Sequence, residues 1–177
     1  MIKAPPTPPA TSSGVVATAR IALGVLVLVL AVGAPVRPAA AETNRVTDER
    51  IVKDPYSALA IGGHDPVAYF VNGRARIGKR SHATMWRGAQ WRFVNEGNLA
   101  AFRTAPAVYA PRFGGYDAMA AARGFVAVGT PLIWSIHDGA LYFFQSRGNQ
   151  FAWRTDPGRF AADARDNWPR LVEGLAR

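Results

Sequence analysis

Two short motifs hold the side chains of this sequence that are best suited to binding a ligand. Residues 62–65 read Gly-Gly-His-Asp and residues 114–117 read Gly-Gly-Tyr-Asp, an offset of 52. If the two turns pack around a pseudo-two-fold axis, their glycines would let a ligand approach the backbone closely. The resulting pocket, suited to a cation or a small polar ligand, would be lined by His64, Asp65, Tyr116 and Asp117.

A metal ion is one ligand that this pocket suggests. His64 and Asp117 are the candidate metal ligands, because imidazole and carboxylate groups bind divalent metals and imidazole also binds copper. No His-x-x-x-His or comparable spacing supports a metal site elsewhere in the sequence. The alternative is that Asp65 and Asp117 cap helices while His64 and Tyr116 pack in the core. The sequence leaves both uses open.

No recognisable catalytic site accompanies these motifs. Cysteine is absent, which excludes disulfides, Cys-ligated zinc, iron–sulfur clusters and thiol nucleophiles. No serine lies in a Gly-x-Ser-x-Gly turn, and the two glycine motifs lack both the Walker lysine and the Rossmann glycine spacing. We therefore expect that the protein is not an enzyme.

An internal repeat relates the two motifs to each other. Residues 88–109 align with residues 139–160 without a gap at an offset of 51, and nine of the 22 aligned positions are identical. With the two Gly-Gly motifs, the repeat defines modules at about 62–109 and 114–160. Two copies indicate a duplication within one domain, since repeat arrays usually need three or more units to bury a continuous core.

Each module has the same order of predicted elements. Aromatic and β-branched residues flank short turns at Gly88 and Gly139, which predicts two β-hairpins. Asn95 and Ser146 follow these hairpins and can cap the start of a helix. The aromatic residues recur at matched positions of the repeat, so we expect them in the core.

Shorter helices complete the predicted fold. Pro106 and Pro157 can each open a second, short helix, and residues 65–73 and 117–124 carry the Asp and Gly of a short helix ahead of each hairpin. The tail, residues 160–175, is expected to form one or two packed helices broken by Pro169. The sequence thus predicts an α+β fold: two tandem modules, each a β-hairpin plus helices, form one small domain with a C-terminal helical segment.

The first 41 residues are typical of a secretory signal peptide. Residues 21–34 are uncharged and follow Arg20, but they are too few to span a bilayer comfortably, which takes about 20 apolar residues. Ala39 and Ala41 form the small-x-small pattern of a signal-peptidase site, so cleavage is expected between Ala41 and Glu42. The alternative is an uncleaved N-terminal anchor.

Cleavage there would define the domain organisation. We expect a signal peptide at 1–41, a linker at 42–55 and one domain at 56–177. The mature protein would be periplasmic or secreted and would meet the membrane only during export.

The positive charge of the chain is a weaker indication of a binding partner once residues 1–41 are removed. The full chain carries a net charge of +9, and removal of residues 1–41 leaves 18 basic and 12 acidic residues, a net charge of +6. Export argues against nucleic acid as the partner, and the basic residues are dispersed along the mature chain. A solvated basic surface is expected, with an acidic protein partner or anionic lipid as the alternative.

Several separated motifs occur in an order that is typical of one known family. They are Asp65-Pro66-Val67, then Trp86-x-Gly88-x-x-Trp91-x-Phe93, then Phe102-x-x-x-Pro106-x-x-Tyr109. This order resembles the YHS domain family, and residues 61–70 and 109–116 look like its exported bacterial branch. The resemblance covers most of residues 56–169. It implies a hairpin-and-helix fold and a role in metal handling.

The departures from the family pattern concern its cysteines. In the YHS domains thought to bind metal, cysteines stand at the positions that here hold Ala68, Val94 and Asn98. In the exported branch a cysteine often follows Gly-Gly-Tyr, where this chain has Asp117. The sequence therefore lacks every thiol through which the resemblance would imply metal or redox chemistry.

Two functions remain as expectations. The first is an exported, non-catalytic YHS-like domain that binds a metal ion, divalent or copper, or a small ligand. The alternative is an interaction or structural protein of the cell envelope that contacts a protein partner through its dispersed basic surface.

Overall fold

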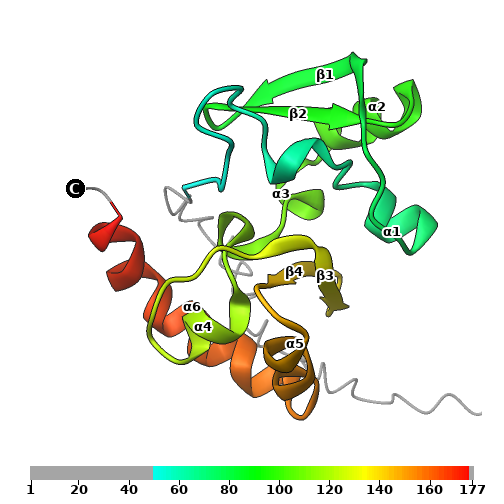
Figure 1. The fold of residues 1–177 in the computed structure, drawn as a ribbon. Coiled ribbons are helices and arrows are strands. Elements are labelled where there is room, and N and C mark those ends of the chain that lie inside the picture. The colour runs from blue at the N-terminus through cyan, green and yellow to red at the C-terminus, as the bar shows by residue number, and fades with distance from the viewer. Residues whose placement is uncertain (1–49, 176–177) are drawn as a thin grey trace, which may run out of the picture. The chain divides into compact units, whose positions relative to one another are not determined.

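The computed structural model describes residues 50–175. The predicted signal peptide and most of the predicted linker lie outside these residues. Two antiparallel two-stranded sheets and several helices make up the described part, which confirms the predicted α+β fold with a C-terminal helix (Figure 1). No helix among residues 50–175 is long and apolar enough to cross a membrane.

The repeat in the sequence is a repeat in the structure. The first module consists of η1 (Ile61–Gly63), α1 (Ala68–Asn72), β1 (Lys79–Trp86), β2 (Ala89–Phe93), α2 (Glu96–Thr104) and α3 (Pro106–Tyr109). The second module has the same order: η2 (Arg112–Gly115), α4 (Ala118–Ala122), β3 (Thr130–His137), β4 (Ala140–Phe144), α5 (Arg147–Arg154) and α6 (Pro157–Gly174).

Both hairpins turn and bend at corresponding residues. The turn residues Arg87-Gly88 and Asp138-Gly139 all have positive φ, between 47° and 69°, as the tight two-residue hairpin turn requires. The pairing of β1 with β2 shifts between Lys79 and Ala83, and that of β3 with β4 shifts between Thr130 and Trp134, 51 residues later. The two predicted hairpins are therefore confirmed, and the first turns at Arg87-Gly88, one residue before the predicted Gly88-Ala89.

The predicted helix starts are also confirmed. The side chains of Asn95 and Ser146 accept hydrogen bonds from the backbone N–H groups three residues later, at the starts of α2 and α5. Pro106 and Pro157 stand in the first turns of α3 and α6, where a missing N–H costs nothing.

The C-terminal region differs from the prediction. The helix that Pro157 opens is not short, and Pro169 does not break the tail, because α6 runs without interruption from Pro157 to Gly174. Its buried face, with Ala161 and Trp168, packs on the second module, and the Asn167 amide donates to the carbonyl oxygens at the end of α4. This packing outweighs the hydrogen bond that a proline removes from a helix interior.

The core has two aromatic clusters, as the matched aromatic residues predict. Trp91, Phe93 and Phe102 are buried in the first, and Phe144 and Trp153 are buried in the second. Strand β4 separates the clusters, since its alternate residues belong to one or the other. All five residues of β4 are buried, whereas β2 buries only one face fully. The second hairpin is thus the central layer of the domain.

The segment ahead of the repeat joins both modules. Ile51, which lies in the predicted linker, is buried in the first cluster, and the Val52 N–H donates to the carbonyl of Gly114. A Cβ atom at Gly114 would collide with the backbone of Arg50, so this crossing requires glycine. The residues just before position 56 therefore belong to the packed domain.

Candidate functional site

Asp65 and Asp117 are completely buried and make equivalent sets of hydrogen bonds. The Asp65 carboxylate accepts from the backbone N–H groups of Val67, Ala68 and Val94 and from the Asn98 amide, at 2.7–3.2 Å. Four donors at corresponding positions of the second module bond the Asp117 carboxylate at 2.6–2.9 Å: Met119 N, Ala120 N, Gln145 N and Asn149 Nδ2. Each carboxylate ties the start of one helix to the end of the hairpin and to the next helix.

Asp117 is the N-cap of α4, as the capping alternative predicts, whereas the N-cap of α1 is Val67 and Asp65 accepts from the N–H groups of Val67 and Ala68 just before and at the start of that helix. Four donors occupy the acceptor sites of each carboxylate, so neither Asp65 nor Asp117 offers a free lone pair to a metal ion. Within residues 50–175, no group of three or more His, Asp or Glu side chains is placed to hold a metal. The side chains present do not fit the metal site that the family resemblance implies.

His64 and Tyr116 serve local packing. The Nδ1 atom of His64 lies 3.1 Å from the carbonyl oxygen of Ile61, and the Tyr116 ring packs on Trp168 with centroids 5.5 Å apart. The two Gly-Gly turns do approach each other, since a Cβ added at Gly115 would lie 3.5 Å from Ile61 Cγ2. This contact is made by an apolar side chain of the core.

The three positions of the absent family cysteines all contact the Asp65 carboxylate. Ala68 and Val94 donate to it through their backbone N–H groups, and Asn98 donates through its side-chain amide. Asn98 and Asn149 are identical residues of the repeat, and this identity was the sequence signal for their shared structural role.

A pocket that the sequence reasoning did not find lies in the second module. Its volume is about 480 Å³, and its wall is formed by β3, α5 and the first residue of α6. Leu132, Trp134 and Ile136 give it apolar surface, while Ser135 and His137 add polar groups from the same strand. The volume is within the range typical of small-molecule sites.

Several polar atoms of this pocket lack partners. Six buried side-chain polar atoms among residues 50–175 have no hydrogen-bond partner, and three of them belong to residues that line the pocket: Ser135 Oγ, His137 Nε2 and Trp153 Nε1. His137 Nε2 lies 3.3 Å from Asp138 Oδ2, but the geometry is not that of a hydrogen bond, and Asp138 is 87% exposed. An unsatisfied buried group costs about 1–3 kcal/mol. Because these atoms are buried, a ligand in the pocket would bond them only after the side chains that cover them moved.

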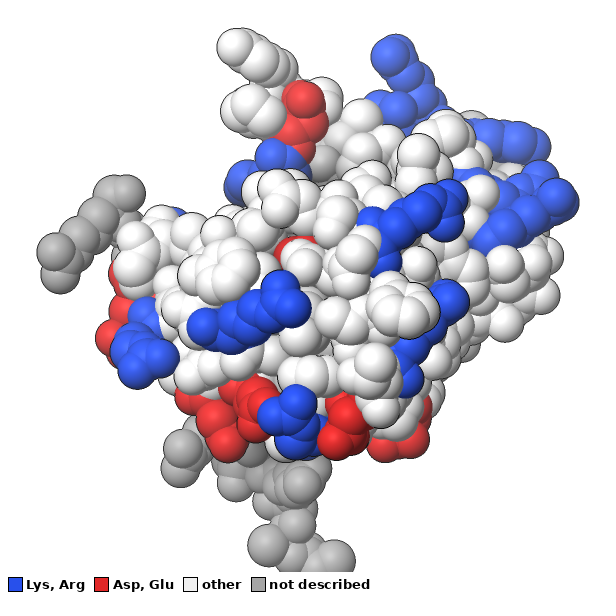
Figure 2. Space-filling model, turned by 60° about the horizontal axis from the view of Figure 1, so that its bottom comes forward, with Lys and Arg blue, Asp and Glu red and all other residues white. Residues whose placement is uncertain are grey.

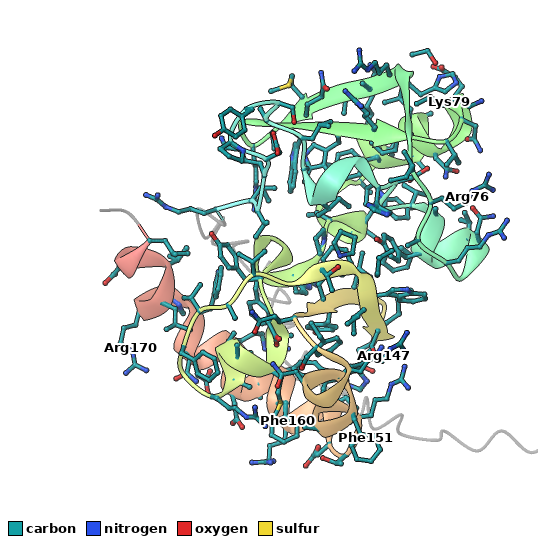
Figure 3. The ribbon with its side chains drawn as sticks, viewed as in Figure 1. Arg76, Lys79, Arg147, Phe151, Phe160 and Arg170 are labelled. Carbon is teal, nitrogen blue, oxygen red and sulfur yellow. The ribbon has the colours of Figure 1, made fainter. Side chains whose placement is uncertain are left out.

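The charged side chains of the pocket are both positive. Arg147 and Arg154 line it from α5, and neither has an ion-pair partner in the described part of the chain. Figure 3 shows Arg147 on α5 beside the second hairpin. The residue equivalent to Arg147 is Glu96, whose carboxylate lies 3.3 Å from His82 Nδ1. The local charge of this position is therefore reversed between the modules.

The pocket exists because one aromatic ring of the first module has no counterpart in the second. Trp86 packs edge-on against Trp91 and Phe102, with centroids 5.8 Å and 5.7 Å away, and fills the space between hairpin and helix. The equivalent residue is His137, which is smaller and polar. The signal in the sequence is a Trp-to-His difference, which appears when the offset of 51 is extended two residues ahead of Gly88 and Gly139.

Tyrosine pKa values near the two clusters are raised. Burial raises the pKa of Tyr142, whose ring packs on Trp153 under the pocket, and the charges of Arg112 and Arg165 oppose this shift. Burial also raises the pKa of Tyr69, and the Asp65 carboxylate adds to the effect. Both phenols are therefore neutral at physiological pH.

Comparison of the chain with protein-family models, with curated proteins and with solved structures finds no match in any of the three.

Proposed function

We propose that this protein is a non-catalytic binding domain for a small ligand, with its site in the pocket of the second module. The observation that carries the proposal is a set of three buried polar atoms without a hydrogen-bond partner, Ser135 Oγ, His137 Nε2 and Trp153 Nε1, in residues lining a pocket of about 480 Å³. The first module has the same backbone plan but fills the corresponding space with Trp86. The second module has a pocket beside His137, whereas the first module fills the equivalent space with the Trp86 ring. A bound ligand explains this difference better than core packing does.

The family and cellular location enter this proposal from the sequence. In agreement with the resemblance to YHS domains, the residues at the three cysteine positions, Ala68, Val94 and Asn98, all contact one carboxylate, that of Asp65. The domain would act after export, in the periplasm or outside the cell. A ligand held by the second module replaces the metal-handling role that the resemblance implies.

The proposal is tested by a fragment screen on the purified protein, read from amide and indole signals in ¹H–¹⁵N NMR spectra. Small acids, amides and amines are the probes, and the signals of β3 and α5 are expected to shift with those that bind. His137→Trp supplies the ring that fills the first module and should abolish these shifts. Met85→Trp adds the same ring at a 62% exposed site of β1 and should leave them unchanged.

Two results would contradict the proposal. One is a set of binding fragments whose shifts lie outside β3, α5 and the start of α6. The other is undiminished binding to the His137→Trp variant when its spectrum shows an intact fold.

The alternative, an envelope protein that uses its basic surface, stays a prediction. Figure 2 shows many Lys and Arg side chains gathered at the upper right of one face and acidic side chains mostly along its lower border. Co-sedimentation with vesicles containing anionic lipid checks it, since salt-sensitive binding that His137→Trp does not affect would favour this function.

A further inference from the structure

We propose that the ligand of this pocket is a small organic carboxylate with an apolar body. The inference rests on the proposed function and names the chemical class that the pocket selects. Three independent properties of the lining support it: its charge, its hydrogen-bond donors and its apolar surface.

The charge of the lining selects an anion. Arg147 and Arg154 stand seven residues apart on α5, two helical turns, and so share one side of it. Asp and Glu are absent from the lining, and the exposed Asp138 carboxylate lies 3.3 Å from the lining residue His137. A guanidinium group matches a carboxylate with two parallel N–H donors, so two unpaired arginines at one pocket favour this anion.

Arg147 is also poorly placed for the helix itself. It is the first residue of α5, where the helix dipole favours negative side chains, and the first turn of α5 contains no acidic residue. The first module has Glu96 at this position, in agreement with the dipole. A residue type that lowers helix stability at its position is expected where that residue serves in binding.

Two hydrogen-bond donors without partners, in residues that line the pocket, favour a ligand that carries acceptor atoms. Trp153 is completely buried, and its Nε1–H can only donate. The Ser135 hydroxyl can donate as well and also lacks a partner. A carboxylate that displaced the side chains covering these two atoms would supply acceptor oxygens for both, whereas an ammonium ligand would add donors to donors.

A minor part of the pocket surface is apolar and could cover an apolar group of the ligand. Leu132 and Ile136 are 67% and 38% exposed on the strand, and the Trp134 ring lies beside them in the lining. The Gln150 amide donates to the backbone carbonyl of Trp134, which holds α5 against the edge of β3 and keeps this wall in place. Acetate alone would leave these surfaces uncovered, while an aryl or branched alkyl group would bury them.

The test compares phenylacetate with its neutral analogue phenylacetamide, by titration of the full protein with the indole N–H signals as readout. The chain has five tryptophans, whose signals are assigned with Trp→Phe variants. Phenylacetate is expected to shift the Trp153 signal and to bind about tenfold or more tightly than phenylacetamide. Raising the ionic strength should weaken the binding of the acid and leave that of the amide unchanged.

Matched arginine variants complete the experiment. Arg147→Gln and Arg154→Gln should each weaken phenylacetate binding severalfold and spare phenylacetamide. Arg103→Gln is the control, because Arg103 is the repeat equivalent of Arg154 and should have no effect. Equal affinity for acid and amide, or no shift of Trp153 with phenylacetate at millimolar concentration, would overturn the carboxylate inference. If the amide still binds and His137→Trp abolishes that binding, the proposed pocket stands; if His137→Trp affects no probe, the proposed function fails as well.

Discussion

The two modules share a backbone plan and a buried carboxylate, but they differ in what fills the space between hairpin and helix. Each module has its Asp-centred set of four hydrogen bonds, its capped helix and its hairpin with a register shift at the same place. The first packs Trp86 against Phe102, and the second leaves a pocket lined by Ser135, His137 and Arg147. The duplication therefore separates the residues that maintain the fold from those that are free to change.

The position of each module in the domain adds to this difference. β4 is buried on both faces and belongs to both aromatic clusters, so the second hairpin has the greater support from its surroundings. Unsatisfied polar atoms are tolerated where the scaffold around them is stable. The module at the centre of the fold is accordingly the one that carries the pocket.

The largest effect is expected where the modules are alike. Asp65→Ala and Asp117→Ala each leave four donors without an acceptor in a buried place and should lower the free energy of unfolding by about 3–5 kcal/mol. Urea denaturation measures the loss, and the two values should agree. Asp156→Ala, which removes the exposed cap of α6, should cost only about 1 kcal/mol. A loss as small as this control for either buried aspartate would contradict the equivalence of the two networks.

A smaller effect is expected where the modules differ. Trp86→His removes the ring that packs on Trp91 and Phe102 and should lower the stability by about 2–3 kcal/mol. The reverse change, His137→Trp, should be neutral or stabilising, because it fills a hollow and replaces an unsatisfied polar atom. Thermal denaturation of both variants checks the pair. Destabilisation of similar size by both changes would mean that the second module has no space for the ring.

The sequence predicts the equivalence of the modules better than their difference. Caps, turns and core aromatics depend on local chemistry, so Asn95, Ser146 and the hairpin glycines could be placed from residue type and spacing alone. The continuity of α6 through Pro169 depends on packing against α4, which local rules do not contain. The pocket required knowing that Trp86 faces Phe102, since only then does His137 at the matched position indicate a hollow. At the Gly-Gly turns the sequence left two uses of Asp65 and Asp117 open, and in the structure both carboxylates bond donors within their own modules.

The smallest effect concerns the contact that links the modules. Tyr69 donates a hydrogen bond to the Pro131 carbonyl, 3.0 Å away, and burial raises its pKa above the ordinary value of about 10. Above pH 10 the unfolded chain releases this proton and the folded chain keeps it, so the stability that Tyr69 contributes falls as the pH rises. Tyr69→Phe should cost about 1 kcal/mol at pH 7 and make the loss of stability between pH 10 and 11 less steep. Urea denaturation at pH 7, 10 and 11 measures both effects. An unchanged dependence of the free energy of unfolding on pH between 10 and 11 would contradict the buried, neutral phenol.

The most direct test of the central claim, that the second module is the binding half of the duplication, is a crystal structure of the protein with phenylacetate. The predicted result is ligand density between β3, α5 and the start of α6, with the carboxylate at Arg147 and Arg154, while Trp86 fills the corresponding space of the first module. Ligand density in the first module, or protein side chains filling the space beside His137, would contradict it.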